Sequence, residues 1–244
     1  MQKIGLVIPC YNEADRLRGD AFLSFVSLHQ QYRILFVNDG SSDLTQKVID
    51  DIAEKHPGLH ALNLPNNGGK AEAVRSGILH MIKTWELDII GFLDADLATP
   101  LEEILHFERL MTRHEQYQIV MGSRWKRLGS KIERSTIRHY LGRIFATVVS
   151  ILFKLSVYDT QCGAKLMRNQ KLDEIFEKPF LSPWFFDIEI LCRYRQQYPG
   201  VPVDDWAAEM PLYVWHEVGG SRIKALDFLS APLALLKIRR HYPF

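Results

Sequence analysis

The fold of this chain is set by a segment that reads YRILFVNDGSSDLTQKVIDDIAEK, residues 32–55. Its first part, residues 32–38, is apolar and rich in residues that favour strands, and it predicts a β-strand. Its second part, residues 44–55, carries Val48, Ile49 and Ile52 at the spacing of an amphipathic helix. A strand followed by such a helix is the first part of a βαβ unit, in which the helix connects two parallel strands.

The same alternation continues on both sides of this segment. Strands are predicted at residues 4–9, 59–64, 88–93 and 119–122, and another amphipathic helix is predicted at residues 70–83. This order predicts an α/β fold with a mainly parallel central sheet and helices on both faces. Ligands of such sheets bind beyond the carboxyl ends of the strands, so the residues that end each strand are the candidate site residues.

Composition excludes several classes of protein. The chain has 244 residues, a length at which one globular domain is expected. With 30 Lys and Arg against 29 Asp and Glu, and 47% hydrophobic residues, it is neither a disordered chain nor a general polyanion binder. We expect no membrane-spanning helix, no secretory signal and therefore a cytoplasmic location. Three widely spaced cysteines indicate reduced thiols rather than disulfides or a zinc site.

Polar residues follow each of the first four predicted strands. Each group could be ordinary turn and helix-cap chemistry, but four such groups at one edge of a sheet favour a ligand site. Two common nucleotide motifs are excluded. The turn after the first strand has no glycine for a dinucleotide site, and Leu64 and Ala71 stand where a P-loop around Lys70 needs Gly and Ser or Thr.

Two carboxylates define the chemistry of this edge. Asp94 and Asp96 follow an apolar strand, and paired hard oxygen ligands suit Mg²⁺ or Mn²⁺, which bind substrate phosphates while keeping waters. Lys70, in a Gly-rich turn, adds a positive charge. Together these residues predict a site for a nucleotide diphosphate, in which Glu13 and Asp39 are acceptors suited to ribose hydroxyls and a base N–H.

Several longer motifs resemble one family. They read VIPCYNE (7–13), VNDGSSD (37–43), NNGGKAEAVRSG (66–77), DADLATP (94–100), GSR (122–124), DTQCGAK (159–165), FDIEIL (186–191) and WHEVGGSRIK (215–224). With them the chain resembles the family 2 glycosyltransferases of the GT-A fold, and within these the dolichyl-phosphate β-glucosyltransferase and polyprenyl-phosphate glycosyltransferase group. Asn38 stands where many relatives have an Asp, which shifts base recognition to Asp39.

The resemblance covers nearly the whole chain and implies a single domain over residues 1–244. Residues 1–123 would form the nucleotide-sugar half, and residues 124–244 an acceptor half with a basic and apolar interfacial helix. It implies a metal-dependent, inverting transfer of a sugar, glucose from UDP-glucose, to a polyprenyl phosphate, with Mg²⁺ or Mn²⁺ held by Asp94 and Asp96. The implied donor-binding residues are Pro9, Tyr11, Glu13, Asp39, Gly68, Lys70, Asp94 and Ala95.

Two alternatives stay open. The first keeps the donor but transfers the sugar to a glycan or a small hydroxyl compound. The second is a sugar-nucleotide-binding protein without catalysis, against which the intact Asp94, Asp96 and Lys70 count.

A basic stretch begins at Arg124 and runs into the apolar residues 144–153. It is either a solvated loop before a core helix or an interfacial element, with basic residues for phosphate or headgroups and apolar residues for lipid. We expect Arg124, Arg134 and Arg138 to contact the acceptor phosphate, the last two on one helical face. We also expect peripheral binding to the cytoplasmic face of the membrane. Because aromatic residues are few here, nucleic acid is not an expected partner.

Asp187 and Glu189 are the remaining catalytic candidates. On a strand they would share a face, whereas on a helix they lie about 200° apart, so at most one would face the site. Neighbouring aromatic residues would desolvate a carboxylate here and raise its pKa. A hydroxyl acceptor needs a base, but a phosphate acceptor, by analogy with phosphorylated side chains, is already mostly dianionic at neutral pH. We therefore expect Asp187, the better candidate, to orient the acceptor or a basic residue.

Overall fold

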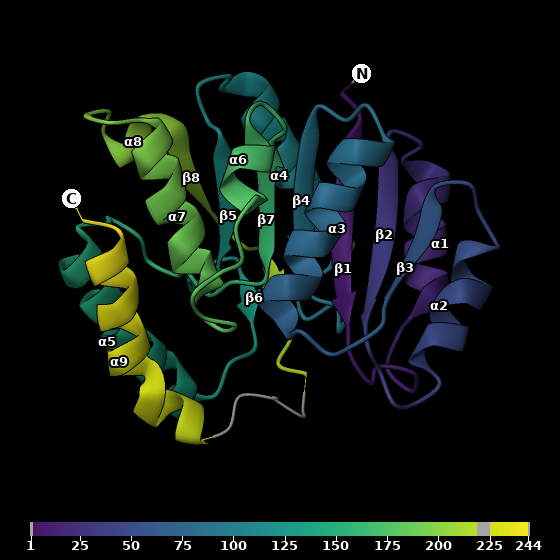
Figure 1. Cartoon of the computed structure of the whole chain (residues 1–244), viewed down its shortest axis with the longest axis horizontal. Coiled ribbons are helices and arrows are strands. Elements are labelled where there is room, and N and C mark those ends of the chain that lie inside the picture. Colours follow the sequence, from purple (N-terminus) through teal and green to yellow (C-terminus); the bar gives the residue numbers. More distant parts are fainter. Residues whose placement is uncertain (1, 219–224, 244) are drawn as a thin grey trace.

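The computed structural model describes residues 2–218 and 225–243, and Figure 1 shows their arrangement. Within these residues a seven-stranded sheet has the strand order β3-β2-β1-β4-β7-β5-β8. Its strands are Ile4–Cys10 (β1), Tyr32–Asp39 (β2), Leu59–Leu64 (β3), Ile89–Leu93 (β4), Ile119–Ser123 (β5), Ala164–Arg168 (β7) and Ala207–Pro211 (β8). Two short strands, Lys131–Ile132 (β6) and Val214–Trp215 (β9), pair with each other.

The sheet is mainly parallel, as predicted. The pairs β1–β2, β1–β4, β2–β3 and β5–β8 are parallel, whereas β7 runs antiparallel to both β4 and β5. The five predicted strands are confirmed, each ending within one residue of its expected bounds. The antiparallel β7 was not predicted. Because β7 comes from the second half of the chain and lies between two strands of the first half, both halves share one sheet.

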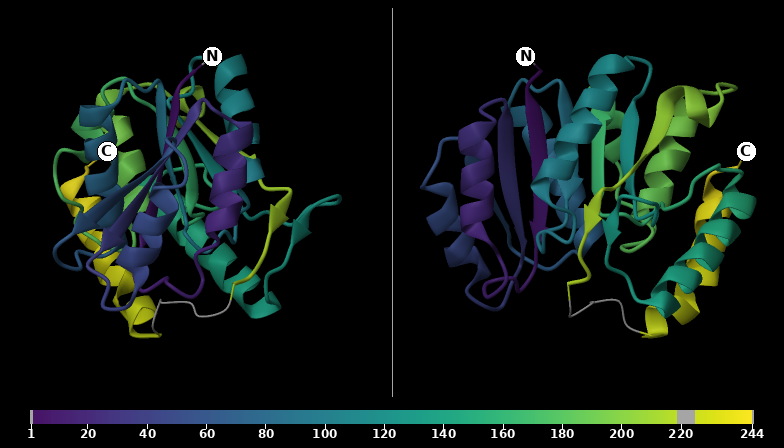
Figure 2. Two further views of the ribbon diagram at one scale, coloured as in Figure 1. Left: turned by 90° about the vertical axis from the view of Figure 1, so that its right-hand side faces the viewer. Right: turned by 180° about the vertical axis from the view of Figure 1, so that it is seen from behind.

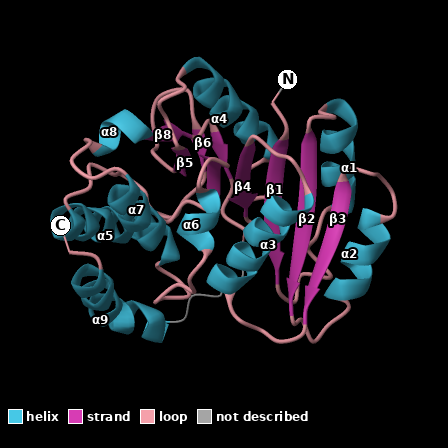
Figure 3. Cartoon of the chain, turned by 45° about the horizontal axis from the view of Figure 1, so that its top comes forward, coloured by secondary structure: helices cyan, strands magenta, loops and turns pink. Residues whose placement is uncertain are grey.

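Helices cover both faces of the sheet, which confirms the predicted layers (Figure 3). One face is covered by Gly19–Leu28 (α1), Thr45–Ala53 (α2) and Leu101–Arg113 (α4), and the other by Lys70–Thr84 (α3), Leu172–Phe176 (α6) and Phe186–Gln197 (α7). A short helix, Val203–Trp206 (α8), leads into β8. The predicted helices at 44–55 and 70–83 correspond to α2 and α3.

The two faces hold separate hydrophobic cores because side chains alternate along each strand. On β1, Leu6 packs with Phe22 of α1 and Ile49 of α2, whereas its neighbour Val7 packs with Val74 of α3. All of these side chains are fully buried. The alternation holds the register of β1, so that its carboxyl end and those of β2 and β4 meet at one edge.

Thr136–Phe153 (α5) and Ala225–His241 (α9) lie side by side beside α7, at the end of the molecule away from β3 (Figures 1 and 2). Among the side chains of α5 that the structure describes, five large apolar ones are exposed: Tyr140, Leu141, Ile144, Val148 and Ile151. No helix in the described part of the chain is long and apolar enough to cross a bilayer. The three cysteines are buried thiols, as predicted.

Candidate active site

The loop that follows β1 is fastened to the loop that follows β2. The backbone N–H of Asn12 donates to Ser41 Oγ at 2.9 Å, and the N–H of Ser42 donates to Asn12 Oδ1 at 2.9 Å. The N–H of Glu13 donates to Thr45 Oγ1 at 2.7 Å. These bonds fix the loop that contains the predicted donor residues Tyr11 and Glu13 at the carboxyl edge of the sheet, while the predicted donor residue Pro9 lies within β1.

The carboxylate of Glu13 forms a forked ion pair with Arg16. Arg16 Nε lies 2.9 Å from one oxygen, and Nη2 lies 2.8 Å from the other. Glu13 is buried, with 8% of its surface exposed. A ribose hydroxyl that binds Glu13, as predicted, would therefore bind a carboxylate whose two oxygens already contact Arg16.

Asp39, at the end of β2, holds the glycine-rich turn before α3. One of its oxygens accepts the N–H of Gly68 and the other accepts the N–H of Gly69, both at 2.8 Å. Gly69 has φ +84°, a conformation that favours glycine. Burial raises the pKa of Asp39, and the two N–H donors partly oppose that rise. The sequence did not predict this structural contact; the predicted contact of Asp39 with a nucleotide base stays a prediction.

The turn held by Asp39 delivers Lys70, the first residue of α3, to the centre of the edge. Lys70 Nζ lies 2.5 Å from Asp94 Oδ1. Burial by itself lowers the pKa of Lys70, but the carboxylates of Asp94, Asp187 and Asp96 outweigh it, so the pKa lies above its ordinary value. The ammonium is therefore charged, as a diphosphate-binding lysine must be.

The carboxylates of Asp94 and Asp96 lie in a tight loop after β4. Asp96 Oδ1 accepts the N–H of Ala98 at 3.0 Å, and Leu97 takes a left-handed conformation with φ 51°, which is uncommon for a branched side chain. Burial and the nearby charge of Asp94 raise the pKa of Asp96, and Glu13 adds to the rise. The loop therefore concentrates negative charge at one point, where a cation would stabilise it.

This donor set fits Mg²⁺ or Mn²⁺. Within residues 2–218 and 225–243, no group of three Asp, Glu, His or Cys side chains could hold a metal by itself. These ions bind through one or two carboxylates and take their remaining ligands from substrate phosphates and water. Asp94 and Asp96 supply such a pair beside the charged Lys70. Their assignment as metal ligands stays a prediction.

Lys165, on β7, is a site residue that the sequence reasoning missed. Its side chain is fully buried, and its Nζ lies 2.6 Å from Asp187 Oδ1. It also donates to the carbonyl oxygens of Thr160 at 3.0 Å and Cys162 at 2.7 Å. The available signal was a lysine at the end of the DTQCGAK motif, followed directly by the apolar Leu166 and Met167 of β7. Asp187 thus contacts a basic residue, which is one of the two roles expected for it.

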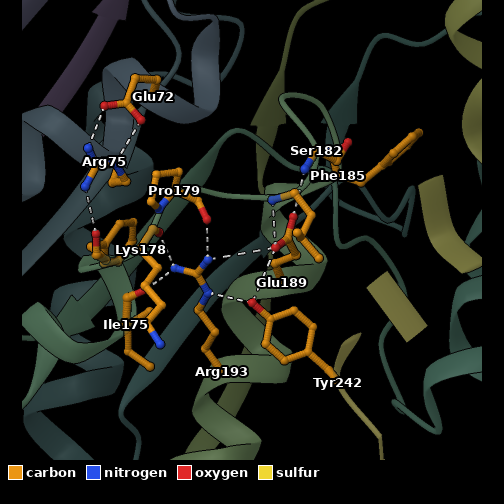
Figure 4. A network of polar contacts seen from close by, with 12 residues as sticks. Glu72, Arg75, Ile175, Lys178, Pro179, Ser182, Phe185, Glu189, Arg193 and Tyr242 are labelled. Carbon is orange, nitrogen blue, oxygen red and sulfur yellow. Dashed lines mark hydrogen bonds and ion pairs between the residues drawn. The ribbon is translucent and has the colours of Figure 1, made fainter. Parts of the chain in front are cut away.

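Glu189 faces away from Lys165, since residues 186–197 form the helix α7. Its oxygens accept the N–H groups of Leu181 and Ser182, each at 3.0 Å. Arg193, one turn later, donates to Tyr242 Oη at 2.9 Å and to three carbonyl oxygens of residues 175–179 (Figure 4). Burial raises the pKa of Glu189, and the backbone N–H groups of Leu181 and Ser182 oppose the rise. This network joins α7, the C-terminus and the segment before α7, and it makes Glu189 a structural residue.

Arg124, the first predicted acceptor-phosphate residue, forms a forked ion pair with Asp159. Arg124 Nε lies 2.6 Å from Oδ2, and Nη2 lies 2.8 Å from Oδ1. Burial alone would raise the pKa of Asp159, but Arg124 outweighs burial and holds that pKa below its usual range. The guanidinium also lies over the ring of Trp215, with 5.6 Å to the centroid. The predicted contact of Arg124 with phosphate stays a prediction.

The predicted pairing of Arg134 and Arg138 on one helical face was wrong. Helix α5 begins at Thr136, after Ser135 in an extended conformation, so Arg134 precedes the helix. Its guanidinium folds back onto Gly142, where an added Cβ would lie 2.6 Å from Nη2. The side chain of Arg138 lies outside the described residues. The charge of Arg134 also lowers the pKa of Asp159. Arg134 therefore lies near the ion pair of Arg124 with Asp159.

The sequence matches the model of Glycosyl transferase family 2 over residues 6–176. The chain belongs to this family. Lys70, Asp94 and Asp39 lie at the carboxyl edge of β1, β2 and β4, which is the edge where mainly parallel sheets bind their ligands.

Related family 2 glycosyltransferases cover nearly the whole chain. A dolichyl-phosphate beta-glucosyltransferase of Trichomonas vaginalis is 31% identical over 97% of this chain and 70% of its own length. The enzyme of the same name from Dictyostelium discoideum is 32% identical over 96% of this chain and 72% of its own length. That from Saccharomyces cerevisiae is 31% identical over 98% and 75%.

Solved structures share the fold. Glucosyl-3-phosphoglycerate synthase from Mycobacterium tuberculosis, in complex with Mn²⁺, UDP and phosphoglyceric acid, has a TM-score of 0.69 at 19% identity and covers 100% of this chain and 80% of its own. The same synthase with Mn²⁺, UDP-glucose and phosphoglyceric acid has a TM-score of 0.67 at 20% identity, over 100% and 81%. At this identity the likeness establishes the GT-A architecture.

Proposed function

We propose that this family 2 glycosyltransferase transfers glucose from UDP-glucose to a polyprenyl phosphate with inversion, in a reaction that needs a divalent metal. The observation that carries the proposal is the convergence of Lys70, Asp94 and Asp96 at one edge of the sheet. The relatives named dolichyl-phosphate beta-glucosyltransferase support the sugar and the acceptor, since they match nearly the full chain.

On the donor side, Lys70 neutralises part of the diphosphate, and Asp94 and Asp96 would hold the cation. When bound, a divalent cation there would supply charge stabilisation for the departing nucleotide without any proton transfer. The remaining predicted donor residues lie around this pair and would contact the nucleoside and the sugar: Pro9, Tyr11, Glu13, Asp39, Gly68 and Ala95.

On the acceptor side, a phosphate oxygen attacks the anomeric carbon and forms the new C–O bond. The bond from that carbon to the UDP oxygen breaks, and UDP leaves with the electron pair. Attack opposite the leaving group inverts the configuration. Because the phosphate is mostly dianionic at neutral pH, by analogy with phosphorylated side chains, no base is required. The ion pair of Asp187 with Lys165 is compatible with a carboxylate that orients rather than removes a proton.

We further propose that the enzyme binds the cytoplasmic face of a membrane through α5. Tyr140, Ile144, Val148 and Ile151 recur at helical spacing along one side of this helix, and each is at least 46% exposed. Basic residues of the stretch that begins at Arg124 and runs into this apolar side suit anionic headgroups. This arrangement favours a lipid acceptor over the alternative of a soluble hydroxyl compound.

A donor panel tests the proposed reaction. Turnover of UDP-glucose, UDP-GlcNAc, UDP-galactose and GDP-mannose is measured with a polyprenyl phosphate and Mn²⁺. We expect UDP-glucose to be used best, and Asp94→Ala and Asp96→Ala to lose at least about 10²-fold in turnover, because the metal supplies several kcal/mol of charge stabilisation. Asp51→Ala, which removes an exposed carboxylate of α2, is the matched control. Full activity in EDTA would contradict the proposal.

The Asp187→Asn variant distinguishes the two acceptors. With a polyprenyl phosphate and saturating Mn²⁺, we expect the folded variant to lose far less in kcat than the roughly 10²–10⁴-fold that removal of a general base costs. The measurement is kcat as a function of pH for both proteins. A loss of the full size, together with disappearance of one ionisation from the rate profile, would show that proton abstraction is needed and would favour the hydroxyl acceptor.

A further inference from the structure

Lys165 is a fully buried cation directly beneath the site. Its ammonium contacts three oxygens: the carbonyls of Thr160 and Cys162, at 3.0 and 2.7 Å, and Asp187 Oδ1, at 2.6 Å. It also lies 5.3 Å from the centroid of the Phe92 ring on the neighbouring strand β4. Removing an ammonium from water is costly unless charged and hydrogen-bonding partners replace the water. Here two carbonyl oxygens and one carboxylate oxygen take the place of that water, so the surroundings of Lys165 suit a buried cation.

The two carbonyl groups belong to segment 160–163, which supports Asp94 in two ways. The Asp94 N–H donates to the carbonyl oxygen of Gly163 at 3.1 Å. The Asp94 carboxylate lies against the Gly163 Cα so closely that an added Cβ would overlap its oxygens. Both the backbone and the side chain of Asp94 therefore rest on the segment whose carbonyls Lys165 holds.

We propose that Lys165 is a positioning residue for the Asp94 carboxylate: with Asp187 as its counter-ion, it fixes segment 160–163 in the conformation against which Asp94 rests. The consequence for the metal rests on the proposed function, in which Asp94 is a ligand of the cation. Lys165 itself does not touch donor or acceptor in this role and acts only through Asp94. Asp187 is then the charge that allows a lysine to be buried there.

A simpler account is that Lys165 only neutralises the buried Asp187. The two accounts differ in what happens when both charges are removed together. Neutralisation alone predicts that Lys165→Met combined with Asp187→Asn restores every property lost in Lys165→Met. Positioning predicts that the double variant recovers stability but leaves the carbonyls of segment 160–163 without a donor.

Strand β7 offers a matched control. Arg168, three residues after Lys165, donates to the carbonyl oxygens of Met111 at 2.7 Å and Tyr117 at 3.0 Å. Arg168→Met therefore also removes a cation that holds two carbonyls, on the same strand but away from Asp94. Lys165→Gln with Asp187→Asn is a second double variant, which removes the charges while keeping an N–H donor for the carbonyls.

The experiment measures amide hydrogen exchange in peptides covering residues 91–99 and 158–166, thermal stability, and Mn²⁺ affinity in the presence of UDP. In the Met double variant we expect a melting temperature above that of Lys165→Met, yet faster exchange in both peptides and Mn²⁺ affinity about 10- to 100-fold weaker than in the wild type. The Gln double variant should recover part of the slow exchange and part of the Mn²⁺ affinity. Arg168→Met should lose stability but keep wild-type exchange in these peptides and wild-type Mn²⁺ affinity.

Wild-type exchange in both peptides of the Met double variant would overturn the proposal. Faster exchange in these peptides of Arg168→Met would overturn it as well. If the Met double variant does not fold, the Gln double variant decides between the accounts. Both double variants lack the two charges, and the Gln double variant keeps an N–H donor for the carbonyls. If the wild type itself binds no Mn²⁺ with UDP, the proposed function fails. Hydrogen exchange needs no metal and still decides the role of Lys165.

Discussion

At the scale of single residues, burial separates two ion pairs of the same chemical types. Lys70 and Asp94 have 27% and 37% of their side-chain surfaces exposed, whereas Lys165 and Asp187 have 0% and 6%. A partly exposed pair is weaker and can exchange partners, while a buried pair cannot lose one partner without a large cost. The first pair is therefore suited to meet a ligand and the second to hold structure.

The shifted pKa of Asp96 leads to a prediction on stability. Burial and Asp94 raise this pKa, so the folded protein becomes less stable as pH rises through the interval between the ordinary pKa of an Asp and the raised one. Asp96→Asn removes that destabilisation, and we expect a higher melting temperature than wild type at neutral pH without metal. The added stabilisation by Mn²⁺ and UDP should be lost. A lower melting temperature in metal-free buffer would contradict the pKa assignment.

At the scale of elements, α7 is the attachment point for the helical pair. Its residue Arg195 donates to the carbonyls of Phe153 and Lys154 at the end of α5, at 2.8 and 2.9 Å. Arg193 binds Tyr242 after α9, and Arg239 of α9 donates to the Leu152 carbonyl at 3.1 Å. Both helices are thus fastened near their carboxyl ends, and the exposed apolar side of α5 is left available for a surface.

The proposed membrane contact predicts how α5 responds to charge. Ile144 and Ile151 are 63% and 76% exposed, so the change of both to Glu should leave stability nearly unchanged. Each lost apolar contact with lipid should weaken binding to anionic vesicles by roughly 10- to 100-fold, since a buried side chain of this size contributes about 1.5–3 kcal/mol. Vesicle flotation measures this effect, with Leu28→Glu, an exposed leucine of α1, as the control.

Wild-type flotation should also weaken with salt, because headgroup attraction is screened within a Debye length. Equal binding of the wild type and the α5 variant, or equal binding to neutral and anionic vesicles at every salt concentration, would argue for a soluble acceptor.

At the scale of the whole molecule, one sheet connects the two halves. β7 carries Lys165 and lies between β4, which leads into Asp94, and β5, which leads into Arg124. A displacement of β7 would therefore reach both Asp94 and Arg124. Because one sheet joins the two halves, we expect the chain to unfold in a single cooperative transition, seen as coincident transitions by different probes.

Ligand binding should raise the stability of this whole unit. With UDP and Mn²⁺ each present at saturating concentration, the free energy of unfolding should rise by about 2.7 kcal/mol at a ligand concentration of 100 Kd. Differential scanning calorimetry measures the shift of the single transition, and EDTA should reverse it. A shift of the same size with UDP and EDTA would show that the donor site does not need the metal.

The sequence by itself determined the layers of this protein and the centre of its site. Strand and helix periodicity is a local property, and it placed β1, β2, β3, β4 and β5 because each buries side chains at a regular spacing. The polar residues that end these strands then followed from the geometry of parallel sheets. Asp94 and Lys70 were found in this way, before any contact between them was known.

Only the tertiary structure decided which partner each buried polar group has. The insertion of β7, the pairing of Lys165 with Asp187 and the capping of the Gly68 turn by Asp39 all join residues far apart in the chain. Arg134 precedes α5, which begins at Thr136, and its guanidinium lies against Gly142, a contact that the spacing of basic residues does not indicate. Such contacts carry no periodic signal, because they depend on how strands are ordered in the sheet and on which charges burial forces together.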